Sequence, residues 1–127
     1  MNPWHSVQLT TGKLVVCHGW VNNLDRVCVV DNDGKVTRGY GGQCYGGQCR
    51  SDVGQLDYPR HLAVDEDSQF ILVADYVNNR VVLLSPMLEF VRCVSEELSC
   101  PYRLYLHQAT RRLFVGHLAL RVTVIQL

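Results

Sequence analysis

The sequence predicts an all-β protein made of repeated antiparallel sheets, and three observations lead to this fold class. Short β-branched runs of strand length recur along the chain, and turn formers such as Asn32-Asp33-Gly34 and Asn78-Asn79 separate many of them. No stretch has a sustained helical period with capping residues. The strand pattern also repeats at a period of about 40 residues, with four strand signals in each complete repeat.

The repeat is clearest between two pairs of segments. Pro59–Asp65 aligns with Pro101–His107 at an offset of 42, and Arg80–Leu84 aligns with Arg121–Ile125 at an offset of 41. A third copy lies upstream, where Arg26–Val30 matches Arg80–Leu84 at an offset of 54 because its connecting segment is longer. This period, with four strands in each unit, is typical of a β-propeller blade. We therefore predict a propeller segment of about three four-stranded antiparallel blades, the last of them incomplete.

The predicted blades divide the chain as follows. Blade 1 covers about 5–40, a Gly- and Cys-rich connection covers 41–57, blade 2 covers about 58–98 and blade 3 covers about 99–127. The predicted strands lie near 5–9, 13–18, 26–31, 35–40, 61–65, 70–75, 80–85, 89–94, 103–107, 112–116 and 121–126. Three blades do not close a ring, because propellers use about four to eight. We expect either a homodimer that completes a six-bladed ring or one piece of a longer propeller.

Composition excludes several function classes. Twelve Lys and Arg balance twelve Asp and Glu, so no global field draws the chain to nucleic acid or to anionic lipid. The longest apolar runs, such as 70–74, are far shorter than the roughly 20 residues needed to cross a bilayer. No charged-then-apolar leader follows Met1. We expect a soluble, cytoplasmic protein that does not bind membranes.

The six cysteines are expected to be free thiols, because an apolar content of 47% supplies a core without disulfides. Cys17, Cys28 and Cys93 lie in or beside valine-rich runs, where a reduced cysteine behaves as a small hydrophobe. Cys44 and Cys49 belong to a duplicated Gly-Gly-Gln-Cys motif in the connection between blades 1 and 2. Two thiolates fall short of the four ligands of a structural zinc site, so we expect a flexible loop and no metal, with a redox-reactive pair as the alternative.

The middle repeat resembles a known family. Its two motifs read Pro59-Arg60-His61-Leu62-Ala63-Val64-Asp65 and Val73-Ala74-Asp75-Tyr76-Val77-Asn78-Asn79-Arg80-Val81. They are similar to the NHL repeat, and the closing part is similar to the carboxyl-terminal propeller blades of tripartite-motif proteins. The resemblance implies a six-bladed ring that serves as a binding platform for protein partners or single-stranded RNA. No Cys/His array of RING spacing is present, so ligase activity is not expected.

One hairpin carries residues expected to be structural. Asp75 ends one strand and Arg80 begins the next, with Asn79 in the turn between them. The carboxylate can accept turn N–H groups and pair with the guanidinium. By alignment at the offset of 41, Gly116 takes the place of Asp75 in the third copy.

Recognition is assigned to the loops of one rim, around 57–61, 75–80, 99–103 and 116–121, because loops on a rigid scaffold commonly carry binding. The candidate binding residues are Tyr58, Arg60, His61, Tyr76, Asn78, Arg80, Tyr102, Arg103 and Arg121. A protein partner is the first expectation, without catalysis or cofactor.

Two alternatives remain. Arginine outnumbers lysine ten to two, so an Arg- and Tyr-bearing face could hold single-stranded RNA, although Asp65-Glu66-Asp67 would cancel part of the field. The other alternative is a metal-dependent propeller lyase, for which the five histidines show no metal-ligand spacing.

Overall fold

The computed structural model describes residues 3–19, 26–41, 56–95 and 98–127, and every regular element in these ranges is a strand. The strands are β1 (Pro3–Gln8), β2 (Leu14–His18), β3 (Arg26–Val30), β4 (Val36–Gly41), β5 (Pro59–Val64), β6 (Ile71–Asp75), β7 (Arg80–Leu84), β8 (Phe90–Ser95), β9 (Pro101–His107), β10 (Arg112–His117) and β11 (Val122–Gln126). In the described part of the chain, no helix has the length and apolarity to span a membrane.

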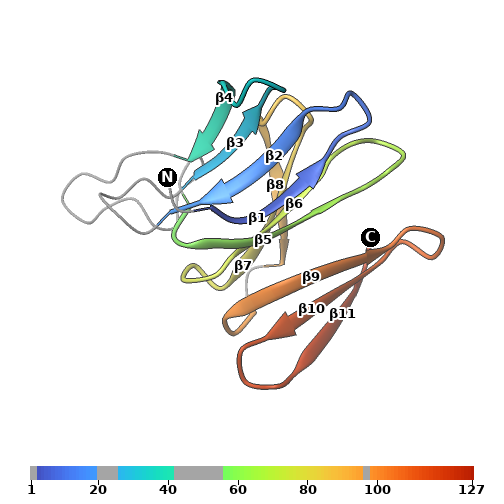
Figure 1. The fold of residues 1–127 in the computed structure, drawn as a ribbon. Coiled ribbons are helices and arrows are strands. Elements are labelled where there is room, and N and C mark those ends of the chain that lie inside the picture. Colours follow the sequence, from blue (N-terminus) through green and yellow to red (C-terminus); the bar gives the residue numbers. More distant parts are fainter. Residues whose placement is uncertain (1–2, 20–25, 42–55, 96–97) are drawn as a thin grey trace.

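The strands form three antiparallel sheets that follow the chain order, β1-β2-β3-β4, β5-β6-β7-β8 and β9-β10-β11. The sheets fan out from their first strands, since β1 contacts β5 and β5 contacts β9 (Figure 1). Each sheet is therefore one blade, with its first strand on the inside and its last strand on the outside. The predicted fold class is confirmed: the chain is an all-β, incomplete propeller whose third sheet has three strands.

The inner strands begin earlier than the sequence predicted. Both β5 and β9 start at a proline, at Pro59 and Pro101, two residues before the predicted starts. Each proline pairs with the neighbouring strand across a register shift, a place where its missing N–H is tolerated. The predicted connection with Cys44 and Cys49 lies outside the described residues, and the described cysteines are all free thiols.

Two hydrophobic cores fill the spaces between consecutive blades. Alternation along each strand points Val15 and Val29 of blade 1 toward Ile71 and Val73 of blade 2. The opposite face of blade 2 packs Ala63, Leu72, Ala74 and Val81 against Leu104, Leu106, Leu113 and Val115 of blade 3. A fully buried Val or Leu contributes about 1.5–3 kcal/mol of burial free energy, so these layers hold the blades together.

The inner strands are joined across blades by histidine rings. The Leu62 amide donates to His5 Nδ1 at 3.2 Å, and the Leu104 amide donates to His61 Nδ1 at 3.1 Å. The two rings stack with centroids 3.7 Å apart. Burial lowers the pKa of His61 to about 4 and also lowers the pKa of His5. Both rings are therefore neutral acceptors at neutral pH, as an amide N–H requires.

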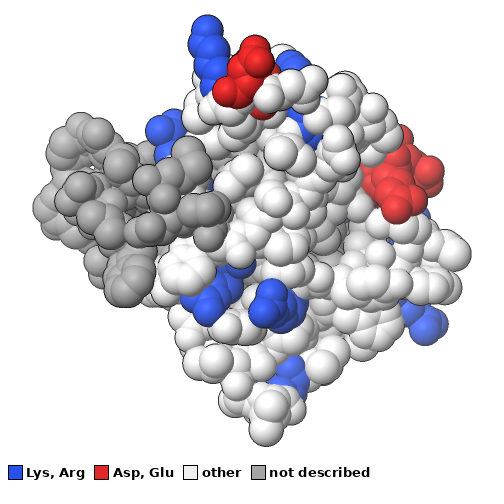
Figure 2. All heavy atoms as spheres, viewed as in Figure 1, with Lys and Arg blue, Asp and Glu red and all other residues white. Residues whose placement is uncertain are grey.

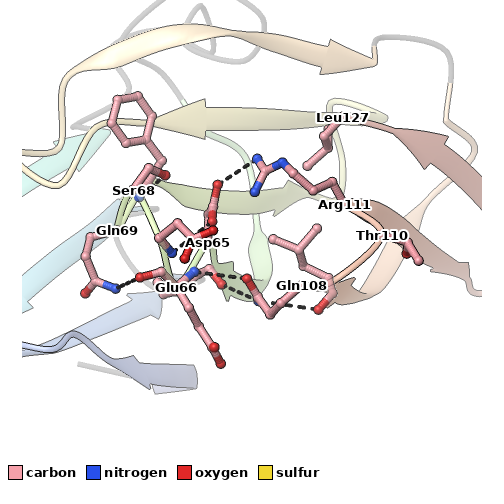
Figure 3. A network of polar contacts seen from close by, with 12 residues as sticks. Asp65, Glu66, Ser68, Gln69, Gln108, Thr110, Arg111 and Leu127 are labelled. Carbon is pink, nitrogen blue, oxygen red and sulfur yellow. Dashed lines mark hydrogen bonds and ion pairs between the residues drawn. The ribbon is translucent and has the colours of Figure 1, made fainter.

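Glutamine side chains join the blades at the opposite rim. The Thr10 amide donates to Gln69 Oε1 at 2.8 Å, and the Glu66 amide donates to Gln108 Oε1 at 3.0 Å. Figure 3 shows the second of these contacts beside an ion pair between Asp65 and Arg111 of 2.7 Å. Hydrogen bonding to Arg111 lowers the pKa of Asp65. A hydrogen bond from a backbone amide to a glutamine side chain is thus present at both junctions, between blades 1 and 2 and between blades 2 and 3.

The repeat extends to unusual backbone conformations. Left-handed φ angles of 48–63° recur at matching positions of blades 2 and 3. The matched pairs are Tyr58 and Cys100, Gln69 and Arg111, and Asn79 and Leu120. Because only one residue in these pairs is an asparagine and none is a glycine, the fold imposes this geometry on residues that do not favour it.

Candidate functional site

The rim that the sequence assigned to recognition is shaped by the hairpin between β6 and β7. Asp75 is fully buried, and its carboxylate accepts from the Asp57 amide at 2.7 Å, from Asn78 Nδ2 at 2.8 Å and from Arg80 Nε at 2.8 Å. Burial raises the pKa of Asp75 to about 6, against the opposite influence of these donors. Arg80 is itself buried, so its guanidinium shapes the hairpin and offers little surface to a ligand.

Asn79 links this hairpin to the next blade. Its φ of 55° places it in the left-handed region, which asparagine tolerates well. Its backbone carbonyl accepts from the Leu98 amide at 3.0 Å, and its side-chain oxygen accepts from the Cys100 amide at 2.9 Å. The turn of blade 2 therefore positions the rim segment that leads into β9.

In blade 3 the structure corrects the predicted equivalent of Asp75. Pro101 pairs with His117, as Pro59 pairs with Asp75, so His117 and not Gly116 occupies that position. The sequence alignment missed this because the turn that follows is one residue shorter in blade 3.

The His117 ring makes contacts comparable with those of Asp75. Its Nδ1 lies 2.5 Å from the Ser99 carbonyl, and its Nε2 lies 2.7 Å from Thr123 Oγ1. In blade 1, His18 occupies the matching place, and its Nε2 lies 3.2 Å from Cys28 Sγ. Blades 2 and 3 thus fasten matching hairpins with an aspartate and a histidine, and His18 lies at the matching strand position of blade 1.

Five side chains at this rim contact one another, and we call them the tyrosine–arginine cluster: Trp4, Tyr58, Arg60, Tyr76 and Tyr102. The Arg60 guanidinium lies 4.5 Å from the ring centroids of both Trp4 and Tyr102. It donates to the Tyr102 hydroxyl at 2.7 Å and to the Tyr58 hydroxyl at 3.2 Å. Aromatic contact and hydrogen bonds together hold the cation in one orientation.

The tyrosine rings also contact one another. Ring centroids are 5.1 Å apart for Trp4 and Tyr58, 5.7 Å for Tyr58 and Tyr76, and 6.2 Å for Tyr76 and Tyr102. The hydrogen bond from Arg60 lowers the pKa of Tyr102, whereas burial is the main cause that raises the pKa of Tyr76. Blade 1, blade 2 and blade 3 all contribute to this row of rings.

The cluster borders a cavity of about 290 Å³ on the rim. Its lining comprises Tyr58, Arg60, Tyr76, Val77, Tyr102 and Leu118, and none of these is acidic. Val77 and Leu118 are 46% and 57% exposed, so apolar surface adjoins the guanidinium. Figure 2 shows the visible acidic side chains at two distant edges, with basic ones near the starts of β5 and β9. The cavity therefore combines a positive charge, aromatic faces and an apolar margin.

The remaining predicted binding residues are dispersed. His61 lies in the junction between inner strands, where its ring accepts the Leu104 amide. The Arg103 guanidinium lies 5.3 Å from the Tyr102 ring centroid, at the border of the cluster. Arg121 is exposed in the turn after His117, and it is not among the residues that line the cavity.

The candidate binding residues did not include Trp4, Val77 or Leu118, although Val77 and Leu118 lie in the predicted rim loops 75–80 and 116–121. The repeat held a signal for Trp4, because it precedes His5 as Arg60 precedes His61. Nothing in the repeat singled out Leu118 within its predicted loop, because its place in the cavity depends on how blade 3 packs. In the described ranges, no group of three or more His, Cys, Asp and Glu side chains is arranged to hold a metal ion.

Comparison with known proteins shows the fold and nothing finer. No family model and no curated protein matches the chain. Among solved structures, the hydrazine synthase of Kuenenia stuttgartiensis is similar with a TM-score of 0.72 and 16% identity, over 98% of this chain and 32% of that protein.

Two further structures have the same architecture. Virginiamycin B lyase from Staphylococcus aureus matches with a TM-score of 0.56 and 12% identity, over 99% of this chain and 41% of the lyase. A protein of unknown function from Bacteroides caccae matches with a TM-score of 0.57 and 13% identity, over 98% and 46% of the two chains. The chain therefore spans less than half the length of these propeller-like proteins.

Proposed function

We propose that this chain is a non-catalytic binding scaffold whose tyrosine–arginine cluster recognises a protein partner. The observation that carries the proposal is the geometry of Arg60, a cation fixed between two aromatic rings at the edge of an apolar cavity. Tyr and Arg are the residue types most often found at the energetic centre of protein interfaces.

The cavity favours a particular ligand chemistry. A guanidinium that is already ordered loses little side-chain entropy when it binds, and its planar fork matches a carboxylate. Val77 and Leu118 offer exposed apolar surface beside it. We therefore expect a peptide segment in which an acidic residue lies next to an aromatic or aliphatic one.

The test is a selection of random peptides displayed on phage, with the purified chain as bait. Enriched peptides should share an acidic residue beside an apolar one. Affinity of an enriched peptide should fall by about tenfold or more in R60K and Y76A, as expected for central interface residues. The controls are R112K and Y105A, which change an exposed arginine and a 61% exposed tyrosine on another surface. Equal affinity for Y76A and Y105A would refute the assignment.

Single-stranded RNA is the second candidate, and the row of tyrosine rings beside Arg60 and Arg103 favours it. Bases stack on such rings at about 1–3 kcal/mol each. Fluorescence anisotropy with labelled oligouridine should then show binding that weakens steeply with salt and is lost in Y76A. Binding that does not respond to salt would exclude this candidate.

A further inference from the structure

A second cavity lies between blades 1 and 2, at the rim opposite the tyrosine–arginine cluster, and we call it the junction cavity. Its volume is about 360 Å³. Blade 1 forms one wall, from the turn between β1 and β2 and from strands β3 and β4, and the turn between β7 and β8 of blade 2 forms the other. None of the lining residues is acidic, so the cavity presents no carboxylate that would repel an anion.

Two cations line the junction cavity, Lys13 and Arg38. In the described ranges, no carboxylate forms an ion pair with either of them. Arg38 Nη1 donates to the Met87 carbonyl at 3.3 Å, which leaves most of the guanidinium N–H groups available. Asp31, in the neighbouring turn between β3 and β4, directs its carboxylate to two amides of its own turn, at 3.0 and 2.9 Å. Both positive charges are therefore available to an anion in the cavity.

The apolar part of the junction cavity is held in place by the core and by a turn. Leu9 and Val29 line the cavity and belong to the core between blades 1 and 2. In the turn between β7 and β8, Leu88 is buried in the same core, and Ser85 Oγ accepts the Met87 amide at 3.3 Å. Met87 is thus fixed at its backbone, while its side chain is 52% exposed beside the cavity. An unbranched thioether adapts easily to an apolar ligand.

The strand register shows that the junction of blades 2 and 3 has a cavity at the matching place. Arg38 pairs with Val29 in blade 1, as Arg92 pairs with Leu83 in blade 2. The first of these pairs lines the junction cavity, and the second lines a cavity of about 280 Å³. Each outer strand therefore places an arginine beside the gap to the next blade.

The two cavities differ in charge at the positions that the inner turns supply. By register, Asp65 takes the place of Leu9, and Phe70 takes the place of Lys13. Asp65 forms an ion pair of 2.7 Å with Arg111, which also lines that cavity. The cavity between blades 2 and 3 thus contains a carboxylate and lacks the lysine, whereas the junction cavity has two cations and no acid.

We propose that the junction cavity binds a small amphipathic carboxylate, an anion with one carboxylate group and an aliphatic body of medium length. The planar guanidinium of Arg38 matches a carboxylate, and the Lys13 ammonium adds a second positive charge. Leu9, Val29 and Met87 would cover the aliphatic body. Sites for small molecules have volumes of about 300–1,000 Å³, so a cavity of about 360 Å³ suits a compact ligand. This site is separate from the tyrosine–arginine cluster and does not depend on its function.

The test is a titration of the full chain with octanoate, followed through the methyl signal of Met87. The chain has two methionines, so labelling of the methionine methyl groups with carbon-13 gives few signals, and M87L identifies the signal of Met87. Octanoate should shift this signal in a saturable way. The matched ligand 1-octanol has the same chain length without a charge, and it should bind about tenfold more weakly or worse, since hydrogen bonds to charged groups are lost. Equal affinity for both ligands would overturn the proposal.

Variants at the two cations locate the carboxylate. K13M and R38Q should each weaken octanoate binding by about tenfold, and R38K should weaken it less because the charge remains. Lys13 is an exposed turn residue, so K13M tests the charge even if R38Q disturbs the contact with the Met87 carbonyl.

Two controls remove a cation outside the junction cavity. K35M changes an exposed lysine at the same rim, and R92Q changes the matching arginine of the other cavity. Both should leave the affinity for octanoate unchanged. Equal weakening by K13M and K35M, or by R38Q and R92Q, would refute the site. If octanoate left the Met87 signal unchanged while a peptide selected on this chain shifted it, the occupant would be a peptide and the proposal would be wrong.

Discussion

The rim hairpins of blades 2 and 3 achieve the same fastening with different chemistry. In blade 2, the Asp75 carboxylate accepts the Asp57 amide from the segment that leads into the blade. In blade 3, the His117 ring contacts the Ser99 carbonyl, at the matching place of the preceding segment. The fold therefore maintains a tie between hairpin and preceding segment, while the residue that makes the tie varies.

The contacts of Asp75 and of His117 differ in how much stability is lost when they are removed. Asp75 is a buried charge that depends on its donors, and Arg80 is a buried cation beside it. His117 fastens its hairpin through the Ser99 carbonyl and the Thr123 hydroxyl, and neither of these partners is charged. Removing one member of a buried ion pair leaves an uncompensated charge, which is more harmful than losing neutral hydrogen bonds.

The largest expected effect follows from D75A. It removes the acceptor of three hydrogen bonds and leaves Arg80 buried without its carboxylate, so stability should fall by about 3–5 kcal/mol. Urea denaturation measures the change. The control is D67A, which alters an exposed aspartate in another turn. A loss as small as that of D67A would show that the ion pair does not hold the hairpin.

A smaller loss, of about 2 kcal/mol, is expected for H117A, because two hydrogen bonds to uncharged partners and a buried ring disappear. Amide exchange should locate the damage at Ser99 and β11 and spare the β6–β7 hairpin. The matched variant is H107A, which removes a histidine from the same blade at the opposite rim. Equal destabilisation by both variants would remove the distinction between the two rims.

Sequence patterns were sufficient for the blades but not for the contacts between them. Strands and hairpins between neighbouring strands depend on residues that are close in the sequence. The β-branched runs and the turn formers between them therefore indicated the sheets. Tyr58, Tyr76 and Tyr102 were recognisable as rim residues through the repeat. The alignment could not show that Arg60 is held between Trp4 and Tyr102, because that contact joins three blades.

The same limit explains the misplaced equivalent of Asp75. A constant offset of 41 put Gly116 in its place, whereas pairing with Pro101 puts His117 there. Loop length changes by one residue between the blades, and a linear alignment has no means to decide on which side of the turn the difference falls. The strand register in the structure, in which Pro101 pairs with His117, identifies the equivalent of Asp75.

The histidine at the junction of blades 2 and 3 makes stability depend on pH, and this supplies a third prediction. Burial lowers the pKa of His61 to about 4, below the ordinary 6.5 of the unfolded chain. Between these values the unfolded chain binds more protons, so this contribution is present above pH 6.5 and is lost as pH falls toward 4. Because the ring is half-buried, about 1 kcal/mol is expected.

The comparison of H61Q with the unmodified chain isolates this effect, because glutamine can accept the Leu104 amide without titrating. Urea denaturation at pH 7 and pH 5 should show a smaller loss on acidification for H61Q. Asp75 acts in the opposite direction, since its pKa is raised to about 6, and it is common to both proteins. Identical pH profiles would show that His61 is not a neutral acceptor.

The smallest effect concerns turn conformation, where blade 2 has the better residue. Asn79 and Leu120 occupy matching positions with φ of 55° and 57°, and Leu120 is fully exposed. Leucine gains no burial there that would offset its strain in the left-handed region. L120N should therefore raise stability by about 0.5–1 kcal/mol, seen as a higher Tm. A119N places the same amide one residue earlier, where φ is not positive, and should leave Tm unchanged. If A119N stabilised the chain as much as L120N, the gain would come from the polar side chain and the backbone argument would be wrong.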